Sequence, residues 1–451
     1  MRYTKRLALF ALIVFGVALI AVSAGQKAAP AAKTAPKKIE NTDPALRWKG
    51  TEQHQAMKNA TPYKDLKWRF IGPDIIGGRC VDVEVPKGSR TTFYVASAVG
   101  GLWKTENTGV TWECLTDELP TLSSGDIAIS EANPDVIYYG TGEANIFRSS
   151  MAGIGVFKSV DAGKTWQHVG LTGTYTIGRI RVHPTNPDIA YVAASGHEWT
   201  YSPDRGVYKT ADGGKTWEKV LYINEKIGAV DIVMVKSDPD TLYAAMYDKV
   251  RLPWHYELGG PESGLYKTTD GGNRWTKLGG GLPTGRIGRI GVDVLLKNPN
   301  TLYAVVENGN RRPPTPQEID AAKKRGVEPS PQTMGNEVYR SDDAGKSWRK
   351  VNVGYEAALN KAPYSFNELK VDPNHADTVY ITGQSLASTT DGGKTWKGLS
   401  WPSDGVMPMV VSSGRPPTQA AMLAPLPRWA ITSRHPAHSP KTLRMYSYDN
   451  P

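Results

Sequence analysis

The octapeptide TADGGKTW, from Thr210 to Trp217, is the segment of this 451-residue sequence that decides its fold. Five variants accompany it: TENTGVTW at 105–112, SVDAGKTW at 159–166, TTDGGNRW at 268–275, SDDAGKSW at 341–348 and TTDGGKTW at 389–396. An Asp at the third position accepts hydrogen bonds from nearby backbone N–H groups, and a following Gly adopts the positive φ that other residues resist. The Trp begins the next strand with a large ring to bury. Each octapeptide therefore predicts a tight hairpin turn.

A second short turn recurs between the octapeptides. It reads NPD at 133–135 and 186–188, DPD at 238–240 and NPN at 298–300. Pro presets φ and Asn or Asp favours the turn, while the segments around it are rich in β-branched and aromatic residues. Successive octapeptide Trp residues lie 48 to 73 positions apart, a period typical of propeller blades. We predict an all-β propeller of four-stranded blades, with six recognisable blades and a seventh, possibly truncated, formed from the chain ends.

The two ends of the chain do not follow the repeat. Residues 1–24 have the basic start, apolar run and small residues of a secretory signal peptide, the alternative being an uncleaved membrane anchor. Residues 25–67, rich in Ala, Pro and Lys, are expected to form a flexible spacer. The propeller is expected over 68–409, and 410–451 form an irregular tail that indicates a truncated or frameshifted end. We expect a secreted or periplasmic protein that is free of the membrane after signal cleavage.

The net charge of +10 comes from the two ends of the chain. Residues 1–42 carry a net +6 and residues 412–451 a net +4, so the repeats are near neutral. We therefore expect no nucleic-acid partner. The two cysteines, Cys80 and Cys114, are too few for a disulfide scaffold. They fall on the inner and outer strands of one blade, beyond disulfide reach, and are expected to be free, buried thiols.

The octapeptide pattern S/T-x-D-x-G-x-T-W resembles the Asp-box, or bacterial neuraminidase repeat, of sialidases, two-propeller xyloglucanases and the sortilin propeller. GTGEAN at 140–145 and RGVYKTADGGKTWEKVLY from Arg205 are similar to bacterial repeat proteins described as glycosyl hydrolase or sortilin-like. The resemblance implies that the box residues are structural and lie away from any catalytic centre. These residues are Asn107, Asp161, Asp212, Asp270, Asp343 and Asp391.

The resemblance implies fold more than activity. The xyloglucanases place one catalytic acid in a stretch spelled like T-D-V-G-G, where residues 97–101 here read SAVGG, so that Ala98 replaces the acid. Their second propeller, which carries the partner acid, is missing from this sequence. Sialidases begin with a Phe-Arg-Ile-Pro-like stretch, from which WRFIGP at 68–73 departs.

Blade geometry locates a candidate site better than these motifs do. In a four-stranded blade the first and third connections share one face, and the second connections lie on the opposite, loop-rich face. Predicted ligand-binding residues on that face are Glu143, Asn145, Arg148, His197, Trp199, Trp254 and His255. Glu143 and Glu198 are the candidates for a catalytic pair. The alternative is that these side chains cover the channel and pair with one another.

Two further expectations concern the loops. Thr315 and Glu318 form a capping-box pattern with Pro316 at the first helical position, which predicts a short helix that ends near Gly326. The two loop histidines, His197 and His255, lack the spacing of metal ligands, and no phosphate-binding or nucleophile motif is present. We therefore expect no metal and no cofactor.

The leading functional hypothesis is a non-catalytic module that recognises a glycan or a protein on the loop-rich face. The first alternative is a glycoside hydrolase related to the sialidase and xyloglucanase propellers. The second alternative is a sortilin-like sorting or assembly scaffold.

Overall fold

The computed structural model describes part of the chain. The described residues are 43–66, 79–145, 150–252, 254–353, 359, 362–383 and 386–399. Contacts divide the chain into Met1–Glu40 and Asn41–Pro451, and every described residue belongs to the second unit. The predicted signal peptide, the start of the spacer, the tail and the predicted seventh blade lie outside the described residues.

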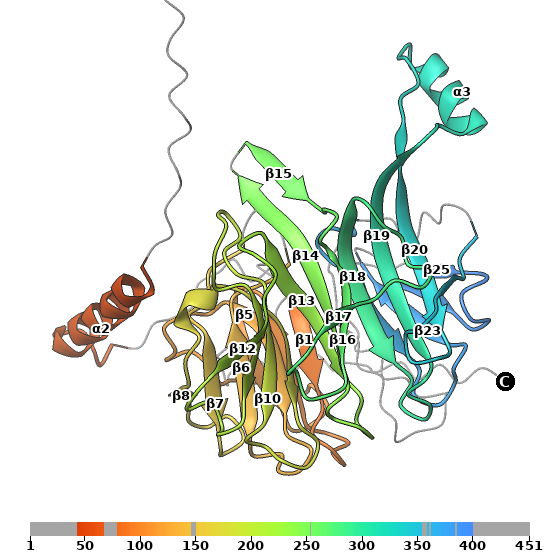
Figure 1. Ribbon diagram of the computed structural model, residues 1–451. Helices are drawn as coiled ribbons and strands as arrows, with labels where there is room; N and C mark the ends of the chain where they lie inside the picture. Colours follow the sequence, from red (N-terminus) through yellow and green to blue (C-terminus); the bar gives the residue numbers. More distant parts are fainter. Residues whose placement is uncertain are drawn as a thin grey trace, which may run out of the picture. The chain divides into compact units, whose positions relative to one another are not determined.

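Six antiparallel sheets make up the described repeats, and each is a propeller blade (Figure 1). The first three blades are β1 (Cys80–Glu84), β2 (Phe93–Ser97), β3 (Gly101–Thr105) and β4 (Glu113–Cys114); β5 (Ser124–Ile129), β6 (Ile137–Thr141), β7 (Val156–Ser159) and β8 (Gln167–His168); and β9 (Ile177–Val182), β10 (Ala190–Ala194), β11 (Gly206–Thr210) and β12 (Glu218–Leu221). The predicted all-β propeller of four-stranded blades is confirmed.

Among the last three blades, the fourth and fifth of the chain carry the longest strands. The last three blades are β13 (Ile227–Met234), β14 (Leu242–Leu252), β16 (Gly264–Thr268) and β17 (Thr276–Lys277), with β15 (His255–Leu258) paired to β14; β18 (Ile287–Val294), β19 (Leu302–Arg312), β20 (Gln332–Ser341) and β21 (Arg349–Lys350); and β22 (Glu368–Val371), β23 (Val379–Thr382), β24 (Leu386–Thr389) and β25 (Lys397–Leu399). Strands follow sequence order in every blade, so the first and third connections share one face, as the blade geometry predicts.

The hydrophobic core lies between consecutive blades. Tyr138 and Val156 of the second blade, for example, pack with Ile180 and Val192 of the third, and all four side chains are buried. Comparable clusters fill the other four interfaces between neighbours. Full burial of such a side chain stabilises the fold by about 1.5–3 kcal/mol. Each blade is therefore held mainly by its neighbours.

The Asp-box turns share one hydrogen-bond pattern, shown here for the third blade. The Thr210 hydroxyl donates to Asp212 Oδ1 at 2.8 Å and accepts from the Gly214 N–H at 2.9 Å. The Thr216 N–H donates to Asp212 Oδ1 at 2.9 Å, and its hydroxyl donates to Oδ2 at 2.6 Å. Gly213 and Gly214 have φ of +77° and +94°. These bonds lower the pKa of Asp212 to about 2, so the carboxylate that closes the turn is fully ionised at neutral pH.

A second set of hydrogen bonds joins each of the first five blades to a turn of the blade that follows it. The Tyr191 hydroxyl and the Lys209 amino group, both on the third blade, donate to the Gly271 carbonyl of the fourth at 2.9 and 2.8 Å. The Lys209 amino group also lies 5.4 Å from the Tyr191 ring centroid. Equivalent tyrosines of the other blades donate to carbonyls of the next blade, namely Ala162, Pro187, Ala344 and Ala376. The blades are thus linked head to tail by bonds that need no particular side chain on the accepting blade.

Two helices lie outside the blades, and none in the described part of the chain is long and apolar enough to cross a membrane. The helix α3 (Pro316–Lys324) lies at the end of the β19–β20 hairpin (Figure 1) and has the expected capping box between Thr315 and Glu318. A further 3-10 helix, η1 (Thr172–Thr174), follows β8. Both cysteines are free, Cys80 being buried and Cys114 half-buried.

The helix α2 (Pro44–Ala60) departs from the expected flexible spacer of residues 25–67. Asp43 caps the helix by accepting from the Ala45 N–H, and Pro44 begins it. Arg47 then donates to the Thr172 carbonyl at 2.8 Å, and the Trp48 ring lies 4.7 Å from that of His168. A few tertiary contacts thus order a segment whose composition offers little to bury.

Candidate functional site

The inner strands of five blades place charged side chains around one central point. Arg179 of β9 contacts four carboxylates: Asp126 at 3.0 Å, Asp231 at 3.2 Å, Glu368 at 3.4 Å and Asp82 at 3.5 Å. The strands approach closely here because of glycine. A Cβ on Gly178 would lie 2.5 Å from the Val230 carbonyl oxygen of the next inner strand. We call Arg179 and its four carboxylate partners the Arg179 cluster.

The Arg179 cluster also joins the backbones of neighbouring blades. Asp126 Oδ2 accepts from the Ile180 N–H at 2.6 Å, and Asp82 and Asp231 accept in the same way from the blades that follow them. Burial raises the pKa of Asp126 well above its ordinary value, and Asp82 adds to the rise although Arg179 opposes it. Four carboxyl groups therefore share one guanidinium. Burial also raises the pKa of Glu368, whereas Arg179 and other nearby cations lower the pKa of Asp231 despite its burial.

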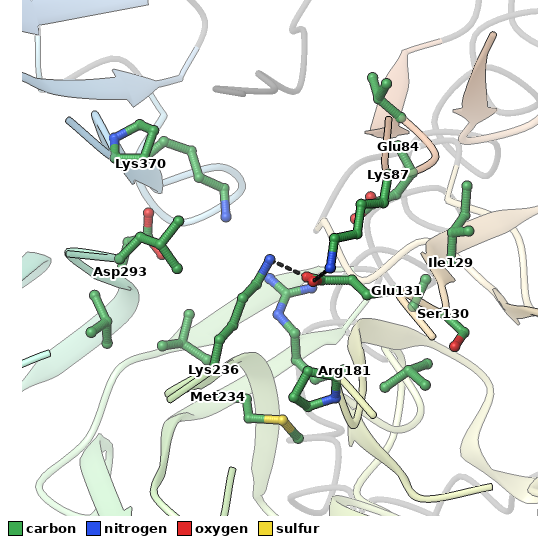
Figure 2. Close-up of a pocket in the computed structure, with 18 of the residues that line it drawn as sticks. Glu84, Lys87, Ile129, Ser130, Glu131, Arg181, Met234, Lys236, Asp293 and Lys370 are labelled. Atoms are coloured by element: carbon green, nitrogen blue, oxygen red, sulfur yellow. Dashed lines mark hydrogen bonds and ion pairs between the residues drawn. The ribbon is translucent and has the colours of Figure 1, made fainter. Parts of the chain in front are cut away.

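A cavity of about 650 Å³ opens beside this cluster, on the face of the first connections. Arg179 and Asp82 line it together with the next charged side chains along the inner strands, Glu84, Arg181 and Lys370 (Figure 2). We call it the mouth cavity. It was not among the predicted sites. Alternation of charged with apolar residues in CVDVE, IGRIRV and ELKV was the sequence signal that could have indicated it.

At the rim of the mouth cavity, Glu131 pairs with two lysines, Lys236 and, at 3.6 Å, Lys87. Asp293 accepts a hydrogen bond from the Val371 N–H at 3.0 Å. Burial raises the pKa of Glu84 to about 7, with a further contribution from Asp82, although three nearby cations lower it. The carboxyl groups of this cavity are therefore engaged or partly protonated.

On the loop-rich face, the predicted acids lie inside the protein. Glu143 is fully buried, and Arg79 donates to it with two nitrogens, one bond being 2.7 Å from Nε to Oε1. Asn145 is buried as well, and Arg148 lies outside the described residues. Glu198 is 3% exposed, and its Oε1 has no hydrogen-bond partner in the described part of the chain.

Lys249 lies near both acids. Its amino group is fully buried and donates to the Ala144 carbonyl at 3.0 Å. Burial lowers the pKa of Lys249 to about 7, although Glu198 and Glu143 oppose the shift. Burial likewise raises the pKa of Glu198 to about 7, with Lys249 opposing and Glu143 adding to the rise. The three groups form one coupled, buried cluster.

His197 is also buried, with its ring stacked 3.5 Å from that of Tyr175. Burial lowers the pKa of His197 to about 4, and the nearby Arg47 and Arg205 add to the shift. The ring is therefore neutral at pH 7. Within the described ranges, no three His, Cys, Asp or Glu side chains could hold a metal ion together.

Aromatic rings make up the exposed part of the loop-rich face. Trp199 is 38% exposed, Tyr256 42% and Trp254 72%, the last at the turn between β14 and β15. The Arg251 guanidinium lies 5.5 Å from the Trp199 ring centroid and 4.8 Å from that of Tyr256, to whose hydroxyl it donates at 3.2 Å. His255 is exposed beside them. The predicted site thus divides into a buried ionic part and an exposed aromatic part.

The fold and its six turns define a β-propeller of the Asp-box-like type. The family described as "Sortilin, neurotensin receptor 3" (Sortilin-Vps10) matches residues 155–301. This match covers the third and fourth blades completely.

Curated relatives cover more of the chain. A xyloglucanase of a Paenibacillus species is 22% identical over 393 residues, spanning 77% of this chain and 34% of the relative. Xyloglucanase Xgh74A of Acetivibrio thermocellus is 22% identical over 390 residues, spanning 75% and 40%. A crystal structure of an ancestral GH74 enzyme superposes with a TM-score of 0.52 at 18% identity, covering 74% of this chain and 40% of that one. The chain therefore matches 34–40% of the length of these two curated relatives.

Proposed function

We propose that this chain is an exported glycan-recognition propeller that binds a polysaccharide of the xyloglucan type on its loop-rich face. The observation that carries the proposal is the exposed aromatic group of Trp199, Trp254 and Tyr256, in which Arg251 contacts the rings of Trp199 and Tyr256. Flat rings of this kind stack on the apolar faces of sugars, and the guanidinium and ring hydroxyl supply directional hydrogen bonds.

Relatives named as xyloglucanases match three quarters of this chain, which supports the choice of ligand. Covering about 60 Å² of one ring would contribute about 1.5 kcal/mol to binding. Three rings could therefore hold a neutral chain without any charged contact.

Burial of the candidate acids favours recognition over hydrolysis. Glycoside hydrolysis requires two carboxyl groups on either side of the bond that is cleaved. Glu143 is fully buried against Arg79, and Glu198 is 3% exposed. Neither carboxyl group faces a sugar that lies on the aromatic rings.

Glycoside hydrolysis remains the second candidate function, because burial gives Glu198 the raised pKa of a general acid. A protein ligand on the same face, as for a sortilin-like scaffold, is the third. Release of reducing ends separates the second candidate from the first. If the Glu198→Gln variant no longer releases them, Glu198 is the acid.

The test is affinity electrophoresis on xyloglucan, combined with detection of new reducing ends. We expect Trp254→Ala to weaken retention about tenfold, with no reducing ends released by either protein. Tyr63→Ala is the matched control, because Tyr63 is 69% exposed and lies outside the blades. Equal retention of Trp254→Ala and the unmodified protein would contradict the proposed site. Retention by neither would favour a protein ligand.

A further inference from the structure

Two half-buried cations, Arg181 and Lys370, line the mouth cavity together with the exposed Arg90. Arg181 donates to the Ile180 carbonyl at 2.8 Å, and among the described residues neither Arg181 nor Lys370 forms an ion pair. Both side chains are half-buried and belong to blades that lie three apart in the chain order. In Figure 2 they enter the cavity from different sides.

Three acids that line the mouth cavity, Asp82, Glu131 and Asp293, have partners other than these two cations, and Asp82 contacts Arg179 at 3.5 Å. Glu131 is engaged by the rim lysines, and Asp293 by the Val371 N–H. Glu84 faces Arg181, Lys370 and Lys236, yet burial and Asp82 keep its carboxyl group partly protonated near pH 7. The mouth cavity is therefore lined by six cations and four acids, an excess of positive charge in a concave, partly desolvated space.

We propose that the mouth cavity binds a ligand through a tetrahedral dianion, a phosphate or sulfate group, held between Arg181 and Lys370 with Lys236 at the rim. Two cations that approach from different sides balance a double negative charge better than the single charge of a carboxylate. The volume of about 650 Å³ exceeds the size of the bare ion and leaves room for the molecule that carries it. This site lies on the face opposite the proposed glycan site and does not depend on it.

Protonation of Glu84 makes binding of the dianion depend on pH. A bound dianion repels the Glu84 carboxylate, so binding favours the protonated form and takes up a proton. Sulfate itself keeps its charge of −2 across neutral pH. Its affinity should therefore rise as the pH falls from 8 to 6, and Glu84→Gln should remove this dependence.

Titration calorimetry of the full chain with sodium sulfate, at constant ionic strength in chloride, is the test. We expect saturable binding that Arg181→Gln and Lys370→Gln each weaken at least tenfold. Lys370→Arg, which keeps the charge, should retain most of the affinity. The control is Lys324→Gln on α3, where an exposed lysine pairs with Asp320 far along the chain from the inner strands.

Absence of saturable sulfate binding by the unmodified protein would overturn the proposal. So would an equal loss in Lys324→Gln, or unchanged affinity in a folded Lys370→Gln variant. Inorganic phosphate and a phosphorylated monosaccharide, titrated in parallel, distinguish the source of the dianion. Tighter binding of the sugar phosphate would identify an ester as the ligand, and equal affinities would identify the free ion.

Discussion

The same strands lead to both faces of this propeller, yet the connections on one face are regular and those on the other vary. On the face of the first and third connections, six turns repeat one hydrogen-bond pattern and differ little in length. On the loop-rich face, the second connections range in length from 98–100 to 313–331, and this face carries both buried ions and exposed aromatic rings. The repeat therefore specifies the scaffold of blades, and the segments that depart from the repeat determine what each face can bind.

The largest expected effect on stability comes from removing Arg179, the cation at the centre of the Arg179 cluster. Arg179→Leu leaves three buried and one half-buried carboxyl group without their guanidinium and should lower the free energy of unfolding by about 3–5 kcal/mol. Because the freed carboxyl groups hold protons more tightly when folded, the loss should be smaller at pH 5 than at pH 8. Urea unfolding at both pH values measures it.

Arg349→Leu is the matched control for Arg179→Leu. Arg349 pairs with Asp342 at 3.0 Å on an exposed surface, so its loss should cost less than about 1 kcal/mol. Equal effects of the two substitutions would show that the Arg179 cluster does not hold the blades together.

A second prediction concerns the buried acid of the loop-rich face. The folded pKa of Glu198 is about 7, above its ordinary 4.5, so the folded state binds the extra proton between these values. Stability should therefore fall as pH rises from 4.5 to 7, and Glu198→Gln should flatten that fall by about 2 kcal/mol. Lys249, whose pKa burial lowers to about 7, acts above this window.

Urea unfolding of Glu198→Gln from pH 4.5 to 7 checks this prediction, with the exposed Glu328→Gln as the control. A pH profile parallel to that of the unmodified protein would mean that Glu198 titrates normally and is no candidate for a general acid.

The smallest expected effect concerns one turn of the regular face. Thr210→Ala leaves the buried Gly214 N–H without its acceptor and should cost about 1–2 kcal/mol. Thr210→Ser should restore most of that loss, because Ser159 and Ser341 make the same bonds in other turns. Thermal unfolding of the two variants compares them directly, and equal losses would mean that the methyl group rather than the hydroxyl matters.

Local rules predicted the short turns and helix caps well. The turn that contains Asp212 follows from the preferences of Asp and Gly over eight residues, and the capping box of α3 follows from Thr315 and Glu318. Each of these features is complete within one short segment. The order and pairing of strands then follow from repetition.

Features that depend on distant contacts were harder to predict. Arg179 meets Asp82 and Glu368 only because the blades close around a common point. His197 and Trp199 are two residues apart, yet one side chain is buried and the other exposed, which only the packing of the loop decides. The helix α2 depends on contacts of Arg47 with a loop more than 100 residues away.

The hydrogen bonds between neighbouring blades have a consequence for how such a chain could grow. Each of the first five blades donates from a tyrosine to a backbone carbonyl of the next, and the acceptors Ala162, Pro187, Gly271, Ala344 and Ala376 use no side-chain atom. A duplicated blade would arrive with its own donor and with an acceptor that any sequence supplies. Gene duplication could therefore lengthen the array without compensating mutations in the blades already present.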